Sequence, residues 1–261
     1  MNFKISDRRI FESCGYFCPT VLLESKETYF SFLLLNDPKT IRKSNKEFKL
    51  FENRCLHRSS LIDDYGFGSK KFFCGYHGWS YSQSGKLNKN SLNSKCENRQ
   101  LKSSHMMGKL GIITSKAGQT ALAKLSKFFP LDYLENKPLY YDSISHKSNW
   151  KLLVENVLES YHLNNVHKET FVKEGYKSNK NYKLEIYEQF ALSKQSSDKS
   201  SINSENSFYD HAFVYPNLSI SNTDNLIYFV SMLIPQNEDE TTMHWFLFGA
   251  PKFFELKKAE Q

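Results

Sequence analysis

The chain has 261 residues, with 39% hydrophobic and 15% aromatic side chains, and a formal net charge of +7. This length allows one large domain or two medium ones, and the composition is that of a folded globular protein. The positive charge suits an acidic redox partner or an anionic ligand, but the lysines are spread among asparagines and serines, which argues against nucleic-acid binding.

The N-terminal stretch and the cysteine content indicate a cytoplasmic protein. Residues 1–17 contain no apolar run that could act as a secretory signal, and the most apolar run, Tyr29–Leu35, is far too short to cross a bilayer. An odd number of cysteines favours a reducing compartment, with cysteines that bind metal or stay free. Cys14 and Cys18 have no second ligand pair nearby, so we expect buried or free thiols there.

The first part of the chain predicts a small all-β module that extends to about Gly118. A short lead-in, residues 1–20, is expected to be helical around Asp7–Ser13. Short β-like runs separated by turn residues follow, and Gln83-Ser84-Gly85-Lys86 is a plausible hairpin turn. The runs are Tyr29–Leu35, Phe48–Glu52, Lys71–Cys74, Trp79–Ser82 and Lys109–Thr114.

The second part predicts a helix packed on an antiparallel sheet, an α+β arrangement. A helical or coil connector, Ala121–Phe129, ends at Pro130 and separates a first domain, residues 1–120, from a second, residues 121–261. Ser193–Ser207 is polar and low in complexity, so it is expected to be a surface loop. Alternating strands are expected at Tyr182–Leu192, Ile227–Ile234 and Thr242–Phe248.

The stretch Asn149–His167, reading NWKLLVENVLESYHLNNVH, predicts a strongly amphipathic helix. Glu155, Glu159 and His162 fall together on one side of it, and taken alone this polar flank is simply a solvated face. The opposite side follows the i, i+3, i+4 spacing of a buried face. Its members are Trp150, Leu153, Val154, Val157, Leu158 and Tyr161.

Two cysteine–histidine pairs point to a metal centre in the first domain. Cys55-Leu56-His57 is followed, after sixteen residues, by Cys74-Gly75-Tyr76-His77. Two thiolates and two imidazoles could hold one tetrahedral zinc, or a [2Fe–2S] cluster with the thiolates on one iron and the imidazoles on the other. The order C-x-H, then C-x-x-H, favours the cluster, because common zinc modules open with two cysteines. Such a cluster carries one electron and needs a second centre for oxygen chemistry.

Both loops, CLHR at Cys55–Arg58 and CGYHGW at Cys74–Trp79, resemble the cluster loops of Rieske-type oxygenases. Rieske proteins of respiratory complexes carry an additional cysteine in each loop, which this chain lacks. The stretch Asn149–His167 is similar to the mononuclear-iron segment of Rieske non-haem iron oxygenase large (alpha) subunits of the aromatic-ring-hydroxylating type. That family pattern is roughly N-W-K, then E-N-x-x-E/D-x-Y-H-x4-H, and Phe213–Leu218 (FVYPNL) resembles the strand and turn that follow it.

The resemblance implies an N-terminal all-β Rieske [2Fe–2S] domain, followed by a helix-on-antiparallel-sheet (helix-grip, START-like) catalytic domain that is incomplete at its C-terminus. His162 and His167 would be two ligands of a 2-His-1-carboxylate ferrous centre. Glu159 would accept a hydrogen bond from an iron-ligating imidazole and link the mononuclear site to the cluster of a neighbouring subunit. The cluster ligands would be Cys55, His57, Cys74 and His77.

The spacing of the two histidines makes a structural prediction. Side chains five residues apart on a regular helix point about 140° apart, so they could not share one metal. Asparagine tolerates the left-handed conformation that ends many helices, so we expect the helix to end at Asn164-Asn165. His167 is then expected in a turn that folds back towards His162.

The third iron ligand is not identified in the sequence. The family supplies an aspartate or glutamate from a long C-terminal helix, and too few residues follow His167 for it, although Lys252–Gln261 resembles its first turns. Three explanations are open: a truncated chain, which the intact metal motifs favour; a separate chain that supplies the helix; or an incomplete and inactive site. The available carboxylates, none in family context, are Asp210, Asp224, Asp239 and Glu255.

By resemblance, the chain would be an oxygenase component that activates O2 at the mononuclear ferrous iron and hydroxylates or demethylates an aromatic or other small organic substrate. Its electrons would come from an NAD(P)H-dependent reductase or a ferredoxin. The resemblance also implies a homotrimer, with or without a small subunit. The segment ENVLESYH is closer to quaternary-ammonium monooxygenases than to naphthalene-type dioxygenases. The alternative is a Rieske electron-transfer or scaffold protein, with two irons per chain instead of about three.

Overall fold

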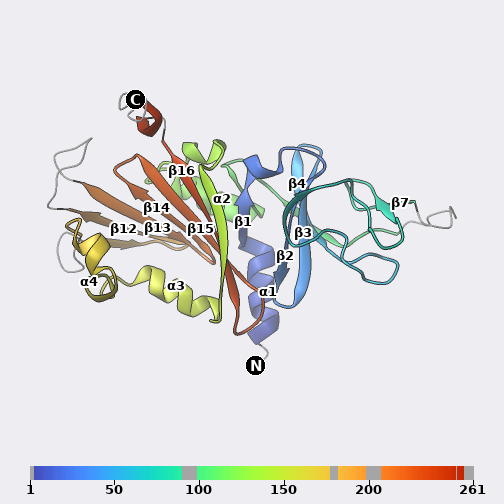
Figure 1. The fold of residues 1–261 in the computed structure, drawn as a ribbon, viewed down its shortest axis with the longest axis horizontal. Coiled ribbons are helices and arrows are strands. Elements are labelled where there is room, and N and C mark those ends of the chain that lie inside the picture. Colours follow the sequence, from blue (N-terminus) through green and yellow to red (C-terminus); the bar gives the residue numbers. More distant parts are fainter. Residues whose placement is uncertain (1–2, 90–98, 177–181, 198–206, 251, 256–261) are drawn as a thin grey trace. The chain divides into compact units, whose positions relative to one another are not determined.

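The chain forms two compact units in a computed structural model that describes residues 3–89, 99–176, 182–197, 207–250 and 252–255 (Figure 1). The N-terminal unit comprises Met1–Thr120 together with Pro235–Glu238, and the C-terminal unit comprises Ala121–Ile234 and Asp239–Gln261. No helix within these described ranges is both long and apolar enough to cross a membrane.

The N-terminal unit is built on a five-stranded antiparallel sheet with the order β5-β2-β3-β4-β8. Its strands are β2 (Thr28–Leu34), β3 (Asp37–Ser44), β4 (Glu47–Glu52), β5 (Gly66–Ser69) and β8 (Ser103–Met106). Two small antiparallel pairs add to it: β1 (Tyr16–Pro19) with β9 (Ile112–Thr114), and β6 (Ser80–Tyr81) with β7 (Leu87–Lys89). Helix α1 (Phe3–Cys14) precedes β1, and a 3-10 turn, η1 (Thr20–Leu23), follows it.

Several predictions for this unit are confirmed, and one strand is wrong. The lead-in is helical, and the hairpin turn joins β6 to β7, with Gly85 at a φ of 85°. The predicted strand at Lys71–Cys74 is absent, and only Phe73 forms an isolated bridge, to Ser80, because the segment is used for the second cysteine–histidine loop. Strand β3 was not predicted, because its buried positions include Lys39 and Arg42.

Four cysteines lie in the described part of the chain, and all four are free thiols. The prediction for Cys14 and Cys18 is therefore confirmed, with Cys18 buried. Cys96 lies outside the described residues.

The C-terminal unit is a seven-stranded sheet with the order β10-β16-β15-β14-β13-β12-β11, antiparallel from β11 to β15 and between β10 and β16. The strands are β10 (Tyr140–His146), β11 (Tyr182–Ile186), β12 (Phe190–Ser196), β13 (Phe208–Val214), β14 (Leu218–Thr223), β15 (Ile227–Pro235) and β16 (Thr241–Gly249). The other elements of this unit are η2 (Asp132–Glu135), α3 (Trp150–Leu158), α4 (Leu163–Val166) and η3 (Lys168–Val172, a π-helical turn), and α2 (Lys116–Leu125) spans the boundary between the two units in the sequence.

The two faces of this sheet differ in chemistry, because successive side chains of a strand point to opposite faces. On one face Tyr133 of η2 stacks on Tyr228 with ring centroids 3.7 Å apart, beside a buried row made by Leu192, Ala212, Ile220 and Val230. The adjacent row on the other face is made by Ser193, His211, Ser221 and Phe229. The sheet therefore has an apolar face towards η2 and a polar face, which α3 and α4 flank (Figure 1).

The predicted strands at Ile227–Ile234 and Thr242–Phe248 are confirmed, whereas two other expectations for this unit are wrong. Tyr182–Leu192 is not one strand but the hairpin of β11 and β12, closed by a bond from the Tyr187 N–H to the Phe190 carbonyl at 2.8 Å. The start of the predicted surface loop, Ser193–Ser207, is also wrong, because residues Ser193–Ser196 belong to β12. Residues 198–206 of that loop, and residues 256–261 of the predicted terminal helix, lie outside the described residues, while residues 252–255 are helical.

Candidate functional site

Two loops of the same backbone design carry the two cysteine–histidine pairs in the N-terminal unit. The N–H of Ser59 donates to the carbonyl of Cys55 at 2.9 Å, and the N–H of Gly78 donates to the carbonyl of Cys74 at 2.9 Å. Both donors have left-handed backbone, with φ of 58° at Ser59 and 71° at Gly78. Each loop is therefore a closed turn that begins at its cysteine.

The four predicted cluster ligands divide into two pairs. The Cys55 and Cys74 side chains are buried and in hydrogen-bond contact with each other. His57 is half-buried and His77 is exposed, and their Nδ1 atoms lie 3.2 Å apart. The His57 ring also stacks on Trp79, with centroids 4.8 Å apart, which fixes its orientation. The structure thus presents an inner pair of thiols and an outer pair of imidazoles.

This division of donors fits a [2Fe–2S] cluster, which takes two thiolates on one iron and two imidazoles on the other. Burial, together with the nearby His77 and Arg58 charges, lowers the pKa of His57. The lower pKa favours the neutral imidazole, which is the form that binds a metal.

Tyr81 is a further residue of this site that the sequence did not reveal. Its hydroxyl lies 3.1 Å from the Sγ of Cys55 and accepts the N–H of Leu56 at 3.0 Å. Either group could donate between a thiol and the hydroxyl, but a Cys55 thiolate bound to iron has no proton, so the hydroxyl would then donate to the sulfur. Burial raises the pKa of Tyr81, and the Cys55 contact raises it further, so the hydroxyl remains a donor. In the sequence Tyr81 is simply an aromatic residue of a predicted strand.

Removing that hydroxyl is expected to lower the reduction potential of the cluster, because hydrogen bonds to the sulfurs stabilise the reduced, more negative form. For Tyr81→Phe, the loss of a hydrogen bond of about 1.4 kcal/mol corresponds to about 60 mV for one electron. Potentiometric titration of the cluster's EPR signal measures the change. Tyr65→Phe, at an exposed tyrosine, serves as the control and should not shift the potential. An unchanged potential in Tyr81→Phe would contradict the assigned bond.

A buried ion pair anchors the first loop to the sheet. Arg42 of β3 donates from Nε to the Oδ2 of Asp63 at 2.8 Å and from Nη2 to its Oδ1 at 2.5 Å. The hydroxyl of Thr40 donates to the same carboxylate at 2.8 Å. The side-chain oxygen of Asn53, at the start of the loop, accepts the backbone N–H groups of Ile62 and Asp63. Both ends of the segment that carries Cys55 and His57 are therefore fixed.

The segment with the second predicted centre is not one continuous helix, and that prediction is wrong. Helix α3 begins at the N-cap Asn149, whose side chain accepts the Lys151 N–H at 3.0 Å, and it ends at Leu158. Glu159 is extended, with φ of −88° and ψ of 150°. Its carboxylate accepts the backbone N–H groups of Tyr161 and His162, at 2.8 and 3.3 Å. Such local capping competes with continuation of a helix.

Three details of the helix prediction change as a result. His162 and His167 are the N-cap and C-cap of the short helix α4, so Asn164-Asn165 lies inside a helix rather than at its end. Tyr161 is 76% exposed instead of buried, while Trp150 does pack as predicted. Because α3 ends at Leu158, Glu155, Glu159 and His162 do not share one helical face.

The structure nevertheless brings Glu159, His162 and His167 together. The two imidazole rings have centroids 5.3 Å apart, and the Nδ1 of His162 contacts the Oε1 of Glu159. With Nδ1 engaged by a carboxylate, Nε2 is the nitrogen of His162 left for a metal. Burial raises the pKa of Glu159, but hydrogen bonds from the ring and backbone of His162 outweigh it, so the net pKa is lowered and the carboxylate is ionised.

The described residues supply two imidazoles for a mononuclear iron but not a third ligand. In this part of the chain, no three His, Cys, Asp or Glu side chains are grouped to hold one ion. Asp224 accepts the Phe208 N–H at 2.8 Å and the Ser207 hydroxyl, which is a structural role. Asp210 alternates with Tyr209 and His211 along β13, so it faces away from the histidine pair. The donor set therefore fits two positions of a three-ligand centre.

A cavity of about 220 Å³ separates the histidine pair from the polar face of the sheet. His162 and His167 line one side of it, together with residues at the end of α3. The other side is formed by side chains from β11 to β16. A metal held by the two histidines would therefore face a partly open cavity with room for a small molecule.

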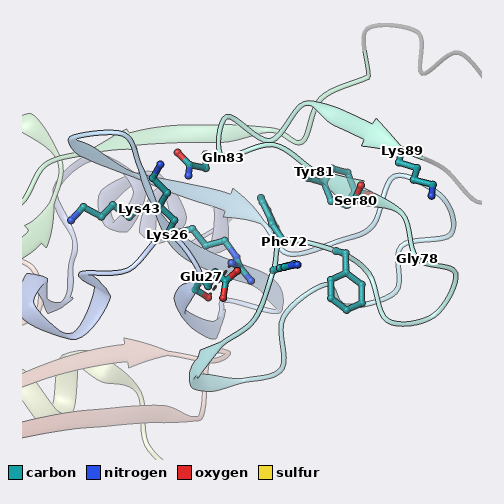
Figure 2. Close-up of a pocket in the computed structure, with 12 residues that line it drawn as sticks. Lys26, Glu27, Lys43, Phe72, Gly78, Ser80, Tyr81, Gln83 and Lys89 are labelled. Atoms are coloured by element: carbon teal, nitrogen blue, oxygen red, sulfur yellow. Dashed lines mark hydrogen bonds between the residues drawn. The ribbon is translucent and has the colours of Figure 1, made fainter.

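A groove of about 500 Å³ lies beside the second cysteine–histidine loop in the N-terminal unit (Figure 2). Gly78 of that loop borders it, together with the ring of Phe72. Glu27 is the one acidic side chain among its described lining residues, which include four lysines: Lys26, Lys43, Lys71 and Lys89. The surface next to the loop is therefore basic.

Two protein families match successive parts of the chain. Residues 18–104 match the Rieske [2Fe-2S] domain, and residues 132–260 match the ring hydroxylating alpha subunit (catalytic domain). These matches confirm the predicted order of an all-β Rieske domain followed by an α+β catalytic domain, and the two cofactors that this order implies.

Curated relatives share modest sequence identity with the chain. Toluate 1,2-dioxygenase subunit alpha of Pseudomonas putida is 25% identical over 63% of this chain and 42% of its own length. The chloroplastic choline monooxygenase of Arabidopsis thaliana is 28% identical over 76% of this chain and 53% of its own length. The chain thus spans about half the length of the curated relatives it matches.

Solved structures share the fold. A quaternary ammonium Rieske monooxygenase, CntA, superposes with a TM-score of 0.78 over 94% of this chain and 71% of that one, at 16% identity. Naphthalene 1,2-dioxygenase from Rhodococcus superposes with a TM-score of 0.75 over 97% of this chain and 72% of that one, at 17% identity.

Proposed function

Because the chain belongs to the family of Rieske oxygenase alpha subunits, we propose that it hydroxylates or demethylates a small organic substrate with O2 and externally supplied electrons. When bound, the cluster supplies single electrons and the mononuclear iron supplies the chemistry of oxygen activation. Cys55, His57, Cys74 and His77 would hold the cluster, and His162 and His167 would hold the iron. One observation carries the proposal: the Glu159–His162 contact beside the ring of His167.

Glu159 is the positioning residue of this proposed site. By engaging Nδ1 of His162 it sets the tautomer and the orientation of the ring. A carboxylate on the far side of a ligating imidazole also gives an arriving electron a short polar path. In this role Glu159 would connect the iron site to the cluster of a neighbouring subunit. The role therefore requires the homotrimer that the family resemblance implies.

Replacing Glu159 by glutamine tests that role. We expect Glu159→Gln to keep its iron but to form about 10–100-fold less product per electron supplied, as is usual when a partner of a ligating histidine is changed. Iron analysis and product measurement during NADH-driven oxygen uptake give the two numbers. Glu188→Gln, at an exposed glutamate paired with Lys124, is the matched control and should behave as wild type. Normal product per electron in Glu159→Gln would refute the role.

A second candidate is an electron-transfer or scaffold protein, and it rests on the two-imidazole donor set described above. In that case the chain would bind a cluster but no catalytic iron. The wild-type chain would then contain two irons rather than about three, with no oxygen uptake coupled to product.

The basic groove supports an acidic electron donor, because lysines around a redox loop accelerate the encounter with a negatively charged partner. We expect Lys71→Glu to slow reduction of the cluster by an acidic [2Fe–2S] ferredoxin about tenfold at low salt, and the difference to shrink at high salt. Stopped-flow absorbance measures the rate. Reduction by dithionite should be unchanged, and Lys109→Glu, outside the groove, is the control. Equally slow reduction of the cluster in Lys71→Glu and Lys109→Glu would show that the groove is not where the electron donor binds.

A further inference from the structure

The cavity beside the histidine pair has one wall that the proposed iron chemistry does not require. This wall is the polar face of the sheet, where β12 to β15 present mainly polar side chains, four of them serines. The residues that form it are Ser193, Gln195, Tyr209, His211, Ser219, Ser221 and Ser231. Four serines on the inner face of a sheet are an unusual choice for packing, because a serine contributes little apolar area.

The wall is organised by hydrogen bonds and carries no charge. The Nε2 of His211 lies 2.8 Å from the Oγ of Ser219, and Ser221 hydrogen-bonds the hydroxyl of Tyr209. Ser231 stands directly opposite Ser219 on the neighbouring strand. Burial lowers the pKa of His211 to about 4, so its imidazole is neutral at physiological pH.

The hydroxyl of Ser219 can still form hydrogen bonds to a ligand. A serine hydroxyl offers one donor and two acceptor positions, and the bond to His211 uses only one of them. Ser231 adds a second hydroxyl across the strand pair. Together they can meet a group that both donates and accepts hydrogen bonds.

The rest of the lining is mainly apolar. Its apolar members are Val157, Leu158, Leu163, Phe171, Phe229 and Met243, and Asn156, Ser160 and Tyr182 add polar positions. The one acidic side chain among the described lining residues is Glu159, which is engaged by His162, and none of these residues is Lys or Arg. An apolar cavity of about 150 Å³ accommodates benzene, so about 220 Å³ suits a single ring with a small substituent.

We propose that this cavity binds a single-ring compound that carries an uncharged hydrogen-bonding group, of which a phenolic hydroxyl is the simplest case. The hydroxyls of Ser219 and Ser231 meet that group, and the apolar side chains of the lining pack against the ring. This substrate class differs in charge from toluate and from choline, the compounds in the names of two relatives. The inference rests on the proposed function for the reaction, but ligand binding itself requires no turnover.

The test compares phenol with toluene, which has nearly the same shape but cannot form the hydrogen bond. Isothermal titration of the metal-loaded full chain, with no electron donor present, measures both affinities. We expect phenol to bind at least about tenfold more tightly than toluene, as one well-placed hydrogen bond allows. Benzoate and choline, as charged probes, should bind more weakly than phenol.

Two variants test whether the serines of the polar wall cause the preference for phenol over toluene. Ser219→Ala is expected to reduce phenol affinity about fivefold or more and to leave toluene affinity unchanged, and Ser231→Ala should act in the same direction. Ser145→Ala, at an exposed serine bonded to Glu240, is the control and should change neither. Circular dichroism verifies that the variants are folded.

Equal affinities for phenol and toluene, or no binding of either, would overturn the inference. So would tighter binding of benzoate or choline, or a phenol preference that survives in both serine variants. Failure of the proposed function is separate, since it appears as two irons per chain or as absent product while the phenol preference remains.

Discussion

Replacing His162 by alanine should remove the mononuclear iron and abolish product formation, while the cluster remains. The described residues offer only two imidazoles to that metal, so the variant leaves a single donor, too few to retain the ion. The iron content should fall from about three to about two irons per chain. The cluster's absorbance and EPR signal should be unchanged, because the four proposed cluster ligands lie in the N-terminal unit.

The corresponding change at His167 should have the same effect, because the two rings are expected to contribute equally to the centre. The control is His105→Ala, a histidine on β8 that contacts Glu47 and lies at neither centre. Retention of about three irons and of product formation in His162→Ala would show that this pair does not hold the catalytic metal.

Replacing Asp63 by alanine should cost about 3–5 kcal/mol of unfolding free energy, because it leaves the Arg42 guanidinium buried without its counter-charge. The side chains of Arg42 and Asp63 are 2% and 0% exposed, so water cannot replace the lost bonds. The same carboxylate also accepts the hydroxyl of Thr40. Since Asp63 closes the segment that carries Cys55 and His57, we expect the variant to lose its cluster more readily as well.

Urea unfolding followed by circular dichroism measures the loss for the N-terminal unit. Asp64→Ala is the matched control: its side chain is 89% exposed and 3.8 Å from Lys70, and an exposed pair of this kind contributes less than about 1 kcal/mol. Similar unfolding curves for the Asp63→Ala and wild-type chains would mean that the Arg42 pair is not a stabilising anchor.

The sequence alone determined which side chains are candidate metal ligands. A cysteine and a histidine one or two residues apart must present a thiol and an imidazole from the same turn, whatever the surrounding fold. The residue types and spacing of the pairs at Cys55 and Cys74 therefore suffice to predict a Rieske domain, and the family match confirms that domain. Strands such as β15 and β16 were predictable for a similar reason, because alternation along a strand is a local property.

Side chains that depend on distant partners were not predictable. Tyr81 looks like any strand aromatic until the fold places its hydroxyl 3.1 Å from Cys55. β3 was missed because Arg42 is polar in sequence and becomes a buried residue only when paired with Asp63. The serines of the cavity wall lie on β12, β14 and β15, so only the sheet register gathers them.

The stretch Asn149–His167 shows both what the sequence determined and what it could not determine. Its sequence determined which side chains could hold a metal, and its spacing showed that one straight helix could not bring them together. Only the tertiary structure showed where the helix breaks, because the outcome depends on whether the Glu159 carboxylate bonds backbone N–H groups or solvent. A choice between a helical bond and a side-chain cap differs by little free energy, so the surrounding fold, not the local sequence, decides it.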